Sequence, residues 1–186
     1  FEACGHKWAD LSENSSGVSL LNDCKYGYSI KKGDMSLTLI KSGTYPNEDA
    51  DIGEHRFTYS IYPHAGRWQE AKTVEMAYNL NVPMPVKRIG KQKGCGEEYD
   101  SFLHCDKESC FIEVIKKAED GDGVIVRMYE NKNNRVRAHI TSGRALVHVY
   151  ECNLLEEKEA ELTVCGTTFE TVFKPYEIKT FRLIFA

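Results

Sequence analysis

Short stretches that alternate between apolar and polar residues recur along the whole chain. They are rich in β-branched and aromatic side chains and are separated by turn residues such as Lys32-Gly33-Asp34, a pattern typical of antiparallel strands. In the first half they fall at residues 17–21, 26–30, 35–40 and 57–62. In the second half they fall at 111–115, 124–129, 136–140, 145–150, 161–164, 169–173 and 180–185. The pattern predicts a mainly β protein with antiparallel β-sandwich architecture.

One segment departs from this period. In residues 69–81 apolar side chains recur at three- and four-residue intervals, and Pro83 and Pro85 follow, so we expect one short helix there. Residues 83–96 are rich in Pro, Lys and Gly and lack an apolar period, which is typical of a linker. We therefore expect two domains, at residues 1–90 and 91–186.

Composition excludes several classes of function. The formal charge of −4 is spread over intermixed acids and bases without a basic stripe, which argues against nucleic acid as a partner. No apolar run approaches the roughly 20 residues of a membrane span, so we expect no membrane contact. The seven cysteines form an odd, irregular set, typical of reduced thiols in a cytoplasmic protein. Because residue 1 is Phe rather than Met, we expect a fragment of a longer protein.

Acids, bases and aromatic rings are concentrated near the N-terminus. They could line a sugar site by hydrogen bonding and stacking, or they could be solvated loop residues with ordinary aromatic packing. The residues concerned are His6, Asp10, Glu13, Asn22, Asp23, Lys25, Tyr26 and Tyr28.

Two clusters have residue types that bind metals but lack the usual spacing. One joins His55 and His64 to the acidic residues 48–54; the other comprises Cys95, His104, Cys105 and Cys110. The chain has no HExxH motif, no EF-hand loop and no two close cysteine pairs. We therefore predict no metal site in this chain, and we interpret residues 118–123 as a turn.

Four segments carry a resemblance to a known family. They are HKWADLSE at 6–13, GVSLLNDCKYGY at 17–28, HRFTYSIYPHAG at 55–66 and VIKKAEDGDGVIVRMYE at 114–130. In order and over nearly the whole chain, they resemble the C-terminal β-rich region of glycoside hydrolase family 38 α-mannosidases, in the branch of bacterial and cytosolic enzymes.

The resemblance implies that the catalytic parts lie outside this chain. In the family an N-terminal α/β barrel holds zinc and an aspartate nucleophile, and a helix bundle and β-sandwich domains follow it. Retaining hydrolysis uses two carboxyl groups about 5 Å apart, and none of them can be assigned to this sequence. Zinc, or another divalent metal, is then expected in the missing catalytic domain, with mannose-containing oligosaccharide as substrate.

The same resemblance gives the two halves their expected roles. Residues 1–90 correspond to the closing part of a large sandwich related to the galactose-mutarotase fold, and residues 91–186 to a small terminal sandwich. The partner would be the N-terminal catalytic domain of the same enzyme, and open strand edges would favour self-association of the fragment. Residues expected to face substrate or the barrel are Asn22, Asp23, Lys25, Tyr26 and Tyr28, with the loop at 46–54 second.

Other classes of function stay open. A free-standing carbohydrate-binding β-sandwich module would use exposed rings such as Trp8, Tyr26, Tyr45 and Trp68 as stacking platforms. A mutarotase-like epimerase would need a sandwich much longer than residues 1–90. An interaction module would be recognised by binding to its own catalytic domain.

Overall fold

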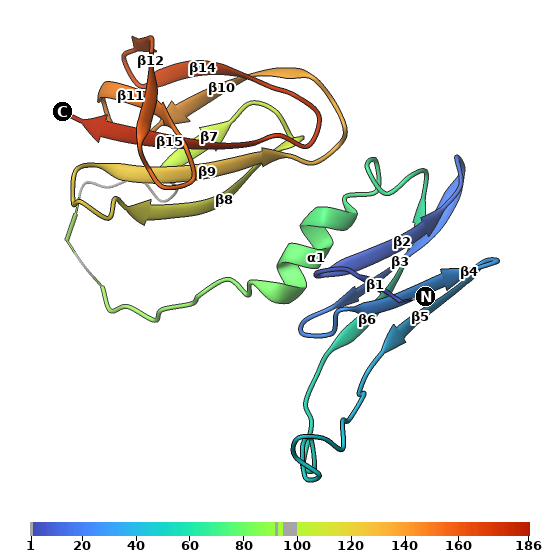
Figure 1. Ribbon diagram of the computed structural model, residues 1–186. Coiled ribbons are helices and arrows are strands. Elements are labelled where there is room, and N and C mark those ends of the chain that lie inside the picture. The colour runs from blue at the N-terminus through green and yellow to red at the C-terminus, as the bar shows by residue number, and fades with distance from the viewer. Residues whose placement is uncertain (1, 92, 95–99) are drawn as a thin grey trace. The chain divides into compact units, whose positions relative to one another are not determined.

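The computed structural model describes residues 2–91, 93–94 and 100–186. Contacts within the chain divide it into two compact units, Phe1–Gly90 and Lys91–Ala186. Both units are built from antiparallel strands, and one helix is found within the described residues, in the first unit (Figure 1). The predicted mainly β, antiparallel fold with one short helix is confirmed. That the two units are parts of two different sandwich domains of a larger enzyme stays a prediction.

The first unit contains two antiparallel sheets of three strands. One sheet has the order β1 (Ala3–Cys4), β4 (Gly27–Lys31), β5 (Asp34–Thr38). The other has the order β2 (Trp8–Ser12), β3 (Ser16–Asn22), β6 (Tyr59–Ala65). The four strands expected in this half correspond to β3, β4, β5 and β6, whereas β1 and β2 had not been predicted.

The turn between β4 and β5 follows directly from its two residues. Lys31 pairs with Asp34, so the loop contains only Lys32 and Gly33. Both have positive φ angles, 51° and 90°, as the tight primed turns of hairpins require. Glycine adopts a positive φ without steric cost, and the two-residue turn that it permits fixes the register of the hairpin.

Helix α1 (Thr73–Asn81) packs against β3 and β2. It begins four residues later than predicted because Lys72 adopts a left-handed conformation, with φ 58°, and residues 68–72 form turns. Val74 and Ala77 are buried on the helix face that meets the sheet. On β3, Leu21 is buried and Ser19 bonds to the helix. The two residues are two positions apart in the strand, so their side chains point to the same side of the sheet.

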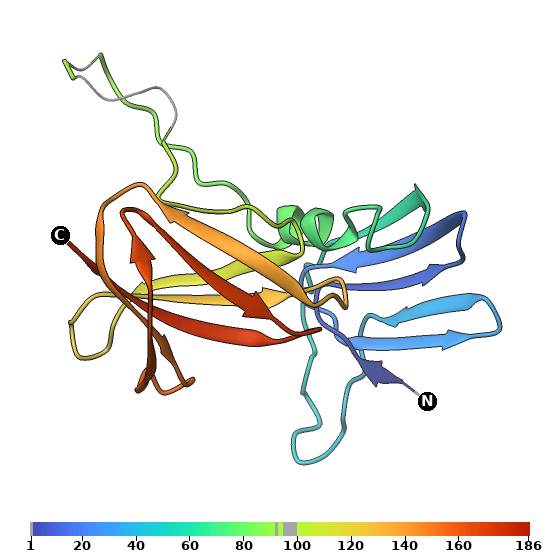
Figure 2. The ribbon, with the colours of Figure 1, turned by 90° about the horizontal axis from the view of Figure 1, so that it is seen from above.

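The second unit is a sandwich of two antiparallel sheets, seen in Figure 2 as strands from yellow-green to red. The first sheet has the order β13 (Val164–Cys165), β14 (Thr168–Phe173), β10 (Val136–Ser142), β7 (Leu103–Cys105). The second has the order β12 (Lys158–Leu162), β11 (Leu146–Cys152), β15 (Ile178–Phe185), β9 (Val124–Glu130), β8 (Cys110–Lys117). The core between them includes the fully buried rings of Phe173 and Phe181.

One connection differs from the prediction, and a second differs from what its two residues alone would indicate. The strand expected at 161–164 is divided at Thr163, because β12 belongs to the five-stranded sheet and β13 to the four-stranded one. Asn133-Asn134 has the sequence of a hairpin turn, and Asn133 has a positive φ of 63°. However, β9 pairs with β8 and β15 whereas β10 pairs with β14 and β7, so this turn carries the chain from one sheet to the other.

The turn between β8 and β9 is held by a buried arginine. Arg182, 5% exposed, donates to Asp120 Oδ2 at 2.6 Å and to the Asp122 carbonyl at 3.2 Å. Gly121 and Gly123 have φ angles of 82° and 88°. A Cβ at Gly123 would lie 2.6 Å from the Leu183 carbonyl oxygen, whereas at Gly121 its nearest neighbour would be the Lys117 side chain at 3.8 Å.

We therefore expect Gly123→Ala to lower the stability of the second unit more than Gly121→Ala. A left-handed alanine costs about 1–2 kcal/mol at either position, and the contact with Leu183 adds to this cost only at Gly123. Hydrogen–deuterium exchange of β9 and β15 measures the free energy of opening in this unit separately. Equal protection in the two variants would contradict the close approach at Gly123.

Candidate functional site

Asn22, at the end of β3, is an internal junction of the first unit. The residue is 1% exposed, and its Nδ2 donates to the hydroxyl oxygen of Tyr28 on β4. Its Oδ1 accepts from the Lys25 amide at 2.6 Å, and its carbonyl accepts from Asn81 Nδ2, at the end of α1, at 2.9 Å. One side chain and its backbone therefore link both sheets and the helix.

Tyr28 is as deeply buried as Asn22. It is 4% exposed, and burial raises the pKa of its phenol. Because buried polar groups need hydrogen-bond partners, the Asn22–Tyr28 pair accounts for both side chains within the fold. Two of the five residues predicted to face substrate or the catalytic domain thus lie in the interior of this chain.

Asp23 is exposed and bonded to the segment that leads into β6. Both of its carboxylate oxygens accept from the Thr58 amide, at 2.9 and 3.0 Å, and the Asp23 amide donates to the Thr58 carbonyl at 3.1 Å. The bond from the Thr58 amide is the main reason that the pKa of Asp23 is lowered. Asp23 therefore presents a fixed negative charge at the surface at neutral pH.

Lys25 and Tyr26 continue this exposed region. Lys25 Nζ lies 4.8 Å from the centre of the Phe57 ring, a cation–π contact. Tyr26 is 51% exposed, and its ring centre lies 4.8 Å from that of His6. We call His6, Asp23, Lys25, Tyr26 and Phe57 the exposed patch. Its carboxylate, amine and rings could bond to sugar hydroxyls or to a protein surface.

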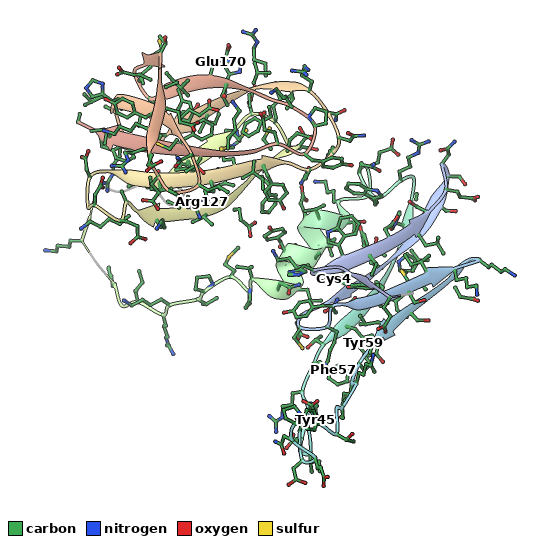
Figure 3. The ribbon with its side chains drawn as sticks, viewed as in Figure 1. Cys4, Tyr45, Phe57, Tyr59, Arg127 and Glu170 are labelled. Carbon is green, nitrogen blue, oxygen red and sulfur yellow. The ribbon has the colours of Figure 1, made fainter. Side chains whose placement is uncertain are left out.

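The acidic loop at 46–54 is a separate feature. Its residues are exposed apart from the half-buried Ala50, as expected for a segment with little to bury. Its bonds are local: the Asp49 amide donates to Asn47 Oδ1 at 3.0 Å, and His55 Nε2 lies 2.7 Å from the Asp51 carbonyl oxygen. Figure 3 shows Tyr45 near the end of this extended part of the chain, with Phe57 nearer to the sheet.

Asp10 and His64 form a buried pair on the side of the sheet that faces the helix. His64 Nε2 lies 2.8 Å from Asp10 Oδ2, and both side chains are 3% exposed. The same carboxylate oxygen accepts from Ser19 Oγ at 2.7 Å, and Ser19 Oγ lies 2.8 Å from Thr73 Oγ1 on α1. This network ties α1 to all three strands of its sheet, so Asp10 has a structural role within the unit.

The eight polar and aromatic residues near the N-terminus therefore do not gather in one place. Asn22 and Tyr28 are internal, and Asp10 belongs to the network with His64. Glu13 lies in the β2–β3 turn, where its amide donates to the Ser16 carbonyl at 2.9 Å. The remaining four belong to the exposed patch.

The rings proposed as stacking platforms are also dispersed. Trp8 and Trp68 are half-buried and pack against each other, with ring centres 4.9 Å apart. Tyr45 is 91% exposed in the loop, and Tyr26 lies in the exposed patch. The four rings do not form a single platform.

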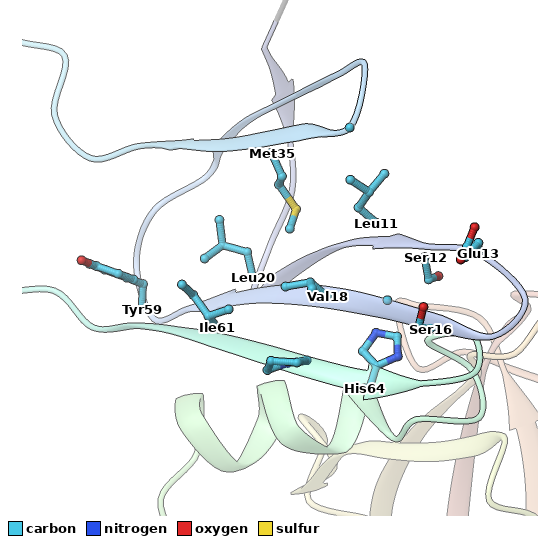
Figure 4. A pocket seen from close by; sticks show the side chains of 13 residues that line it. Leu11, Ser12, Glu13, Ser16, Val18, Leu20, Met35, Tyr59, Ile61 and His64 are labelled. Atoms are coloured by element: carbon cyan, nitrogen blue, oxygen red, sulfur yellow. The ribbon is translucent and has the colours of Figure 1, made fainter.

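A hollow in the first unit was not expected from the sequence. A cavity of about 880 Å³ lies between the face of β2-β3-β6 opposite α1 and the β4–β5 hairpin, which contributes Gly33 and Met35 (Figure 4). Its wall is mainly apolar, and three of its side chains are substantially exposed: Ile61 at 66%, Tyr59 at 54% and Val18 at 38%. Its lining also includes Leu11, Leu20, Met35 and Pro63. A contiguous apolar surface of this kind is typical of a contact with another protein segment.

A signal for this cavity was present in the sequence. In β3, Ser19 and Leu21 point to the helix, whereas Val18 and Leu20, which alternate with them, line the cavity. A strand with apolar residues at both odd and even positions is covered on both faces in a complete fold.

In residues 2–91, 93–94 and 100–186, no three His, Cys, Asp or Glu side chains lie close enough together to hold a metal ion. His64 is engaged with Asp10, and His55 with the Asp51 carbonyl. Cys95, named in the second metal cluster, lies outside the described residues. The described part of the chain contains no helix long and apolar enough to cross a membrane.

We expect Tyr28→Phe to destabilise the first unit by about 1–3 kcal/mol, because the buried Asn22 amide would lose its partner. The matched variant Tyr26→Phe removes the same hydroxyl from an exposed ring and should change stability by no more than about 0.5 kcal/mol. Both tryptophans lie in this unit, so tryptophan fluorescence during urea unfolding measures its stability. Equal effects of the two variants would contradict the role of the Asn22 junction.

Two models of one protein family match this chain. The model of the glycosyl hydrolases family 38 C-terminal domain matches residues 1–49, and that of the family 38 C-terminal beta sandwich domain matches residues 110–181. An α-mannosidase from Enterococcus faecalis V583 has the same fold, with a TM-score of 0.79 at 18% identity over 98% of this chain and 21% of that one.

Curated relatives extend the match over the whole chain. Alpha-mannosidase G of Dictyostelium discoideum is 40% identical over 99% of the chain, which is 17% of that protein. Human alpha-mannosidase 2C1 is 30% identical over 99% of the chain and 18% of its own length, and the Saccharomyces cerevisiae alpha-mannosidase is 32% identical over 100% and 19%. The chain thus spans about a fifth of these relatives. It belongs to glycosyl hydrolase family 38, as the C-terminal β-sandwich region of that family.

Proposed function

We propose that the chain is the non-catalytic C-terminal β region of an α-mannosidase and that it supports the catalytic domain of the same enzyme. The relatives named as α-mannosidases support the activity, and they are about five times longer than this chain. The observation that carries the proposal is the apolar cavity over β2-β3-β6.

The occupant of this cavity is another segment of the same enzyme. One face of β2-β3-β6 is covered by α1, and the opposite face presents Val18, Tyr59 and Ile61 to solvent in this chain. Burial of apolar surface is worth about 25 cal/mol per Å², so a complete protein gains stability by covering this face. About four-fifths of the length of the relatives lies outside the matched region and can supply the cover.

In this proposal the chemistry belongs to the rest of the enzyme. Retaining hydrolysis of α-mannosides in mannose-containing oligosaccharides, with zinc or another divalent metal, takes place in the catalytic domain. The described residues of this chain do not form a ligand set for such a metal, so we assign none of them to it. A cytoplasmic location agrees with the free thiols of six cysteines in the described part of the chain.

The exposed patch is the part of this chain proposed to touch substrate or the catalytic domain. Of the five residues predicted for this role, Asp23, Lys25 and Tyr26 are accessible. The half-exposed Tyr26, beside His6, also favours the second candidate function, a free-standing carbohydrate-binding module. Such a module would bind mannosides without any other domain.

The test is to produce this chain and the remainder of its parent enzyme as two separate polypeptides, mix them and follow zinc-dependent hydrolysis of an aryl α-mannoside. We expect activity to depend on docking. Ile61→Glu should weaken docking at least about a hundredfold, because an unpaired carboxylate would be buried in an apolar contact.

Ile178→Glu is the matched control, since Ile178 is 63% exposed on β15 and outside the cavity. Docking of the Ile61 variant with unchanged affinity would overturn the role of the cavity. Binding of mannosides by the isolated chain, without docking, would favour the carbohydrate-binding module. Light scattering of the isolated chain tests the expected self-association through its open strand edges.

A further inference from the structure

Two cysteines of the second unit lie at the ends of neighbouring strands. Cys105 is the last residue of β7, and Cys110 is the first residue of β8. Cys105 packs against the hydrophobic cluster that contains Cys110, and the interaction between the two thiols is the first cause of the pKa shift of each. Cys105 is partly accessible, whereas Cys110 is 6% exposed and belongs to the hydrophobic core. An accessible thiol thus contacts a buried one.

The fold holds this pair in place. The Cys110 amide donates to the Lys107 carbonyl at 3.0 Å, which closes the turn between the two cysteines. The Asp106 amide donates to the His139 carbonyl at 3.1 Å, and Asp106 Oδ1 accepts from the His139 amide at 2.8 Å. The thiols therefore meet because β7 and β8 are fixed by their sheets.

The pair lies where the two sheets of the second unit are connected. β7 is an edge strand of the four-stranded sheet, and β8 is an edge strand of the five-stranded sheet. The residues between Cys105 and Cys110 are thus the connection between the two layers of the sandwich. A bond between the two sulfur atoms would join these layers covalently at one edge.

The two thiols differ in reactivity. The hydrogen bond from Cys110 is the main cause that lowers the pKa of Cys105, and the charge of Asp106 opposes this shift while that of Lys107 adds to it. The same hydrogen bond, together with burial, raises the pKa of Cys110. The accessible sulfur is therefore the better nucleophile, because the thiolate is the reactive form of cysteine.

We propose that Cys105 and Cys110 form a reversible disulfide on exposure to hydroperoxides, which links the two sheets of the second unit. The arrangement is that of an accessible cysteine beside a resolving cysteine, as in redox-sensitive sites.

The reaction balances in two steps. The Cys105 thiolate attacks one peroxide oxygen, the O–O bond breaks, and hydroxide leaves with a proton from solvent as water; Cys105 becomes a sulfenic acid. The Cys110 sulfur then attacks the Cys105 sulfur, the S–O bond breaks, and the departing hydroxide takes the Cys110 proton as a second water. Two thiols lose two electrons in total, and one hydrogen peroxide gains them. A reducing dithiol reverses the change by exchange.

Other cysteines of the chain serve as internal controls. Cys4, Cys24 and Cys165 are exposed. The hydrogen bond to Asp23 raises the pKa of Cys24 and so lowers its reactivity. Accessibility alone would favour these thiols over Cys105, whereas the proposed pair favours Cys105.

The test treats the reduced chain with less than one equivalent of hydrogen peroxide, blocks free thiols with N-ethylmaleimide and digests with trypsin without reduction. Because trypsin cleaves after Lys107, between the two cysteines, a Cys105–Cys110 disulfide appears in the mass spectrum as two joined peptides that separate on reduction. The peptide with Cys105 also contains Cys95, so further cleavage with Glu-C after Glu97 or Glu98 shows which of the two is bonded to Cys110. We expect this species before any modification of Cys165. Oxidation should also raise the unfolding temperature of the second unit, because a disulfide restricts the unfolded chain.

Two controls keep the test independent of any folding defect. Cys110→Ser should leave a sulfenic acid at Cys105 that dimedone traps, and in 8 M urea, about the concentration that unfolds ordinary domains, the preference for Cys105 should disappear. The proposal is overturned if no Cys105–Cys110 disulfide forms, so that all of the wild-type chain carries N-ethylmaleimide on both cysteines after treatment. It is also overturned if Cys4 or Cys165 is oxidised first, or if the preference persists in urea.

Discussion

The sheet β2-β3-β6 carries apolar side chains on both faces, and the first unit is organised around this constraint. On one face Leu21 is buried together with Val74 and Ala77 of α1. On the other face the side chains of Val18 and Ile61 line an open cavity. A sheet of this kind is a middle layer, because each of its faces needs a cover. The chain belongs to a family of much longer proteins, and a segment outside this chain is the proposed cover of the open face.

Buried polar groups make the covered face specific. Hydrophobic contacts would allow α1 to slide along the sheet, whereas the Asp10–Ser19–Thr73 bonds and the bond from Asn81 to the Asn22 carbonyl fix both its position and its direction. Such groups are costly when they lose a partner, so a fully satisfied set favours one arrangement over its alternatives. In the second unit Arg182 holds the β8–β9 turn through its Nη1, although its buried Nε has no hydrogen-bond partner among the described residues.

The sequence predicted most strands, because their alternation survives in the final fold, and it predicted the β4–β5 turn through Gly33. It did not predict β2, since Trp8 to Ser12 mixes polar and apolar residues and is recognisable as a strand only from its pairing with β3. The helix began later than expected because a left-handed Lys72 cannot be read from apolar spacing. Among the candidate site residues, accessibility separated Asp23, Lys25 and Tyr26 from Asn22 and Tyr28, and burial depends on tertiary contacts that composition does not contain.

The segment that follows the acidic loop is fixed to the β3–β4 connection by the bonds between Asp23 and Thr58, and the bonds of the loop itself are local. The register of β6 is set separately, by its pairing with β3 from Asn22–Tyr59 to Ser16–Ala65. Insertions or deletions within the acidic loop, before Thr58, would therefore leave β3 and β6 where they are. The loop can thus differ in length and charge, and so give this surface other properties, without displacing the sheet that carries it.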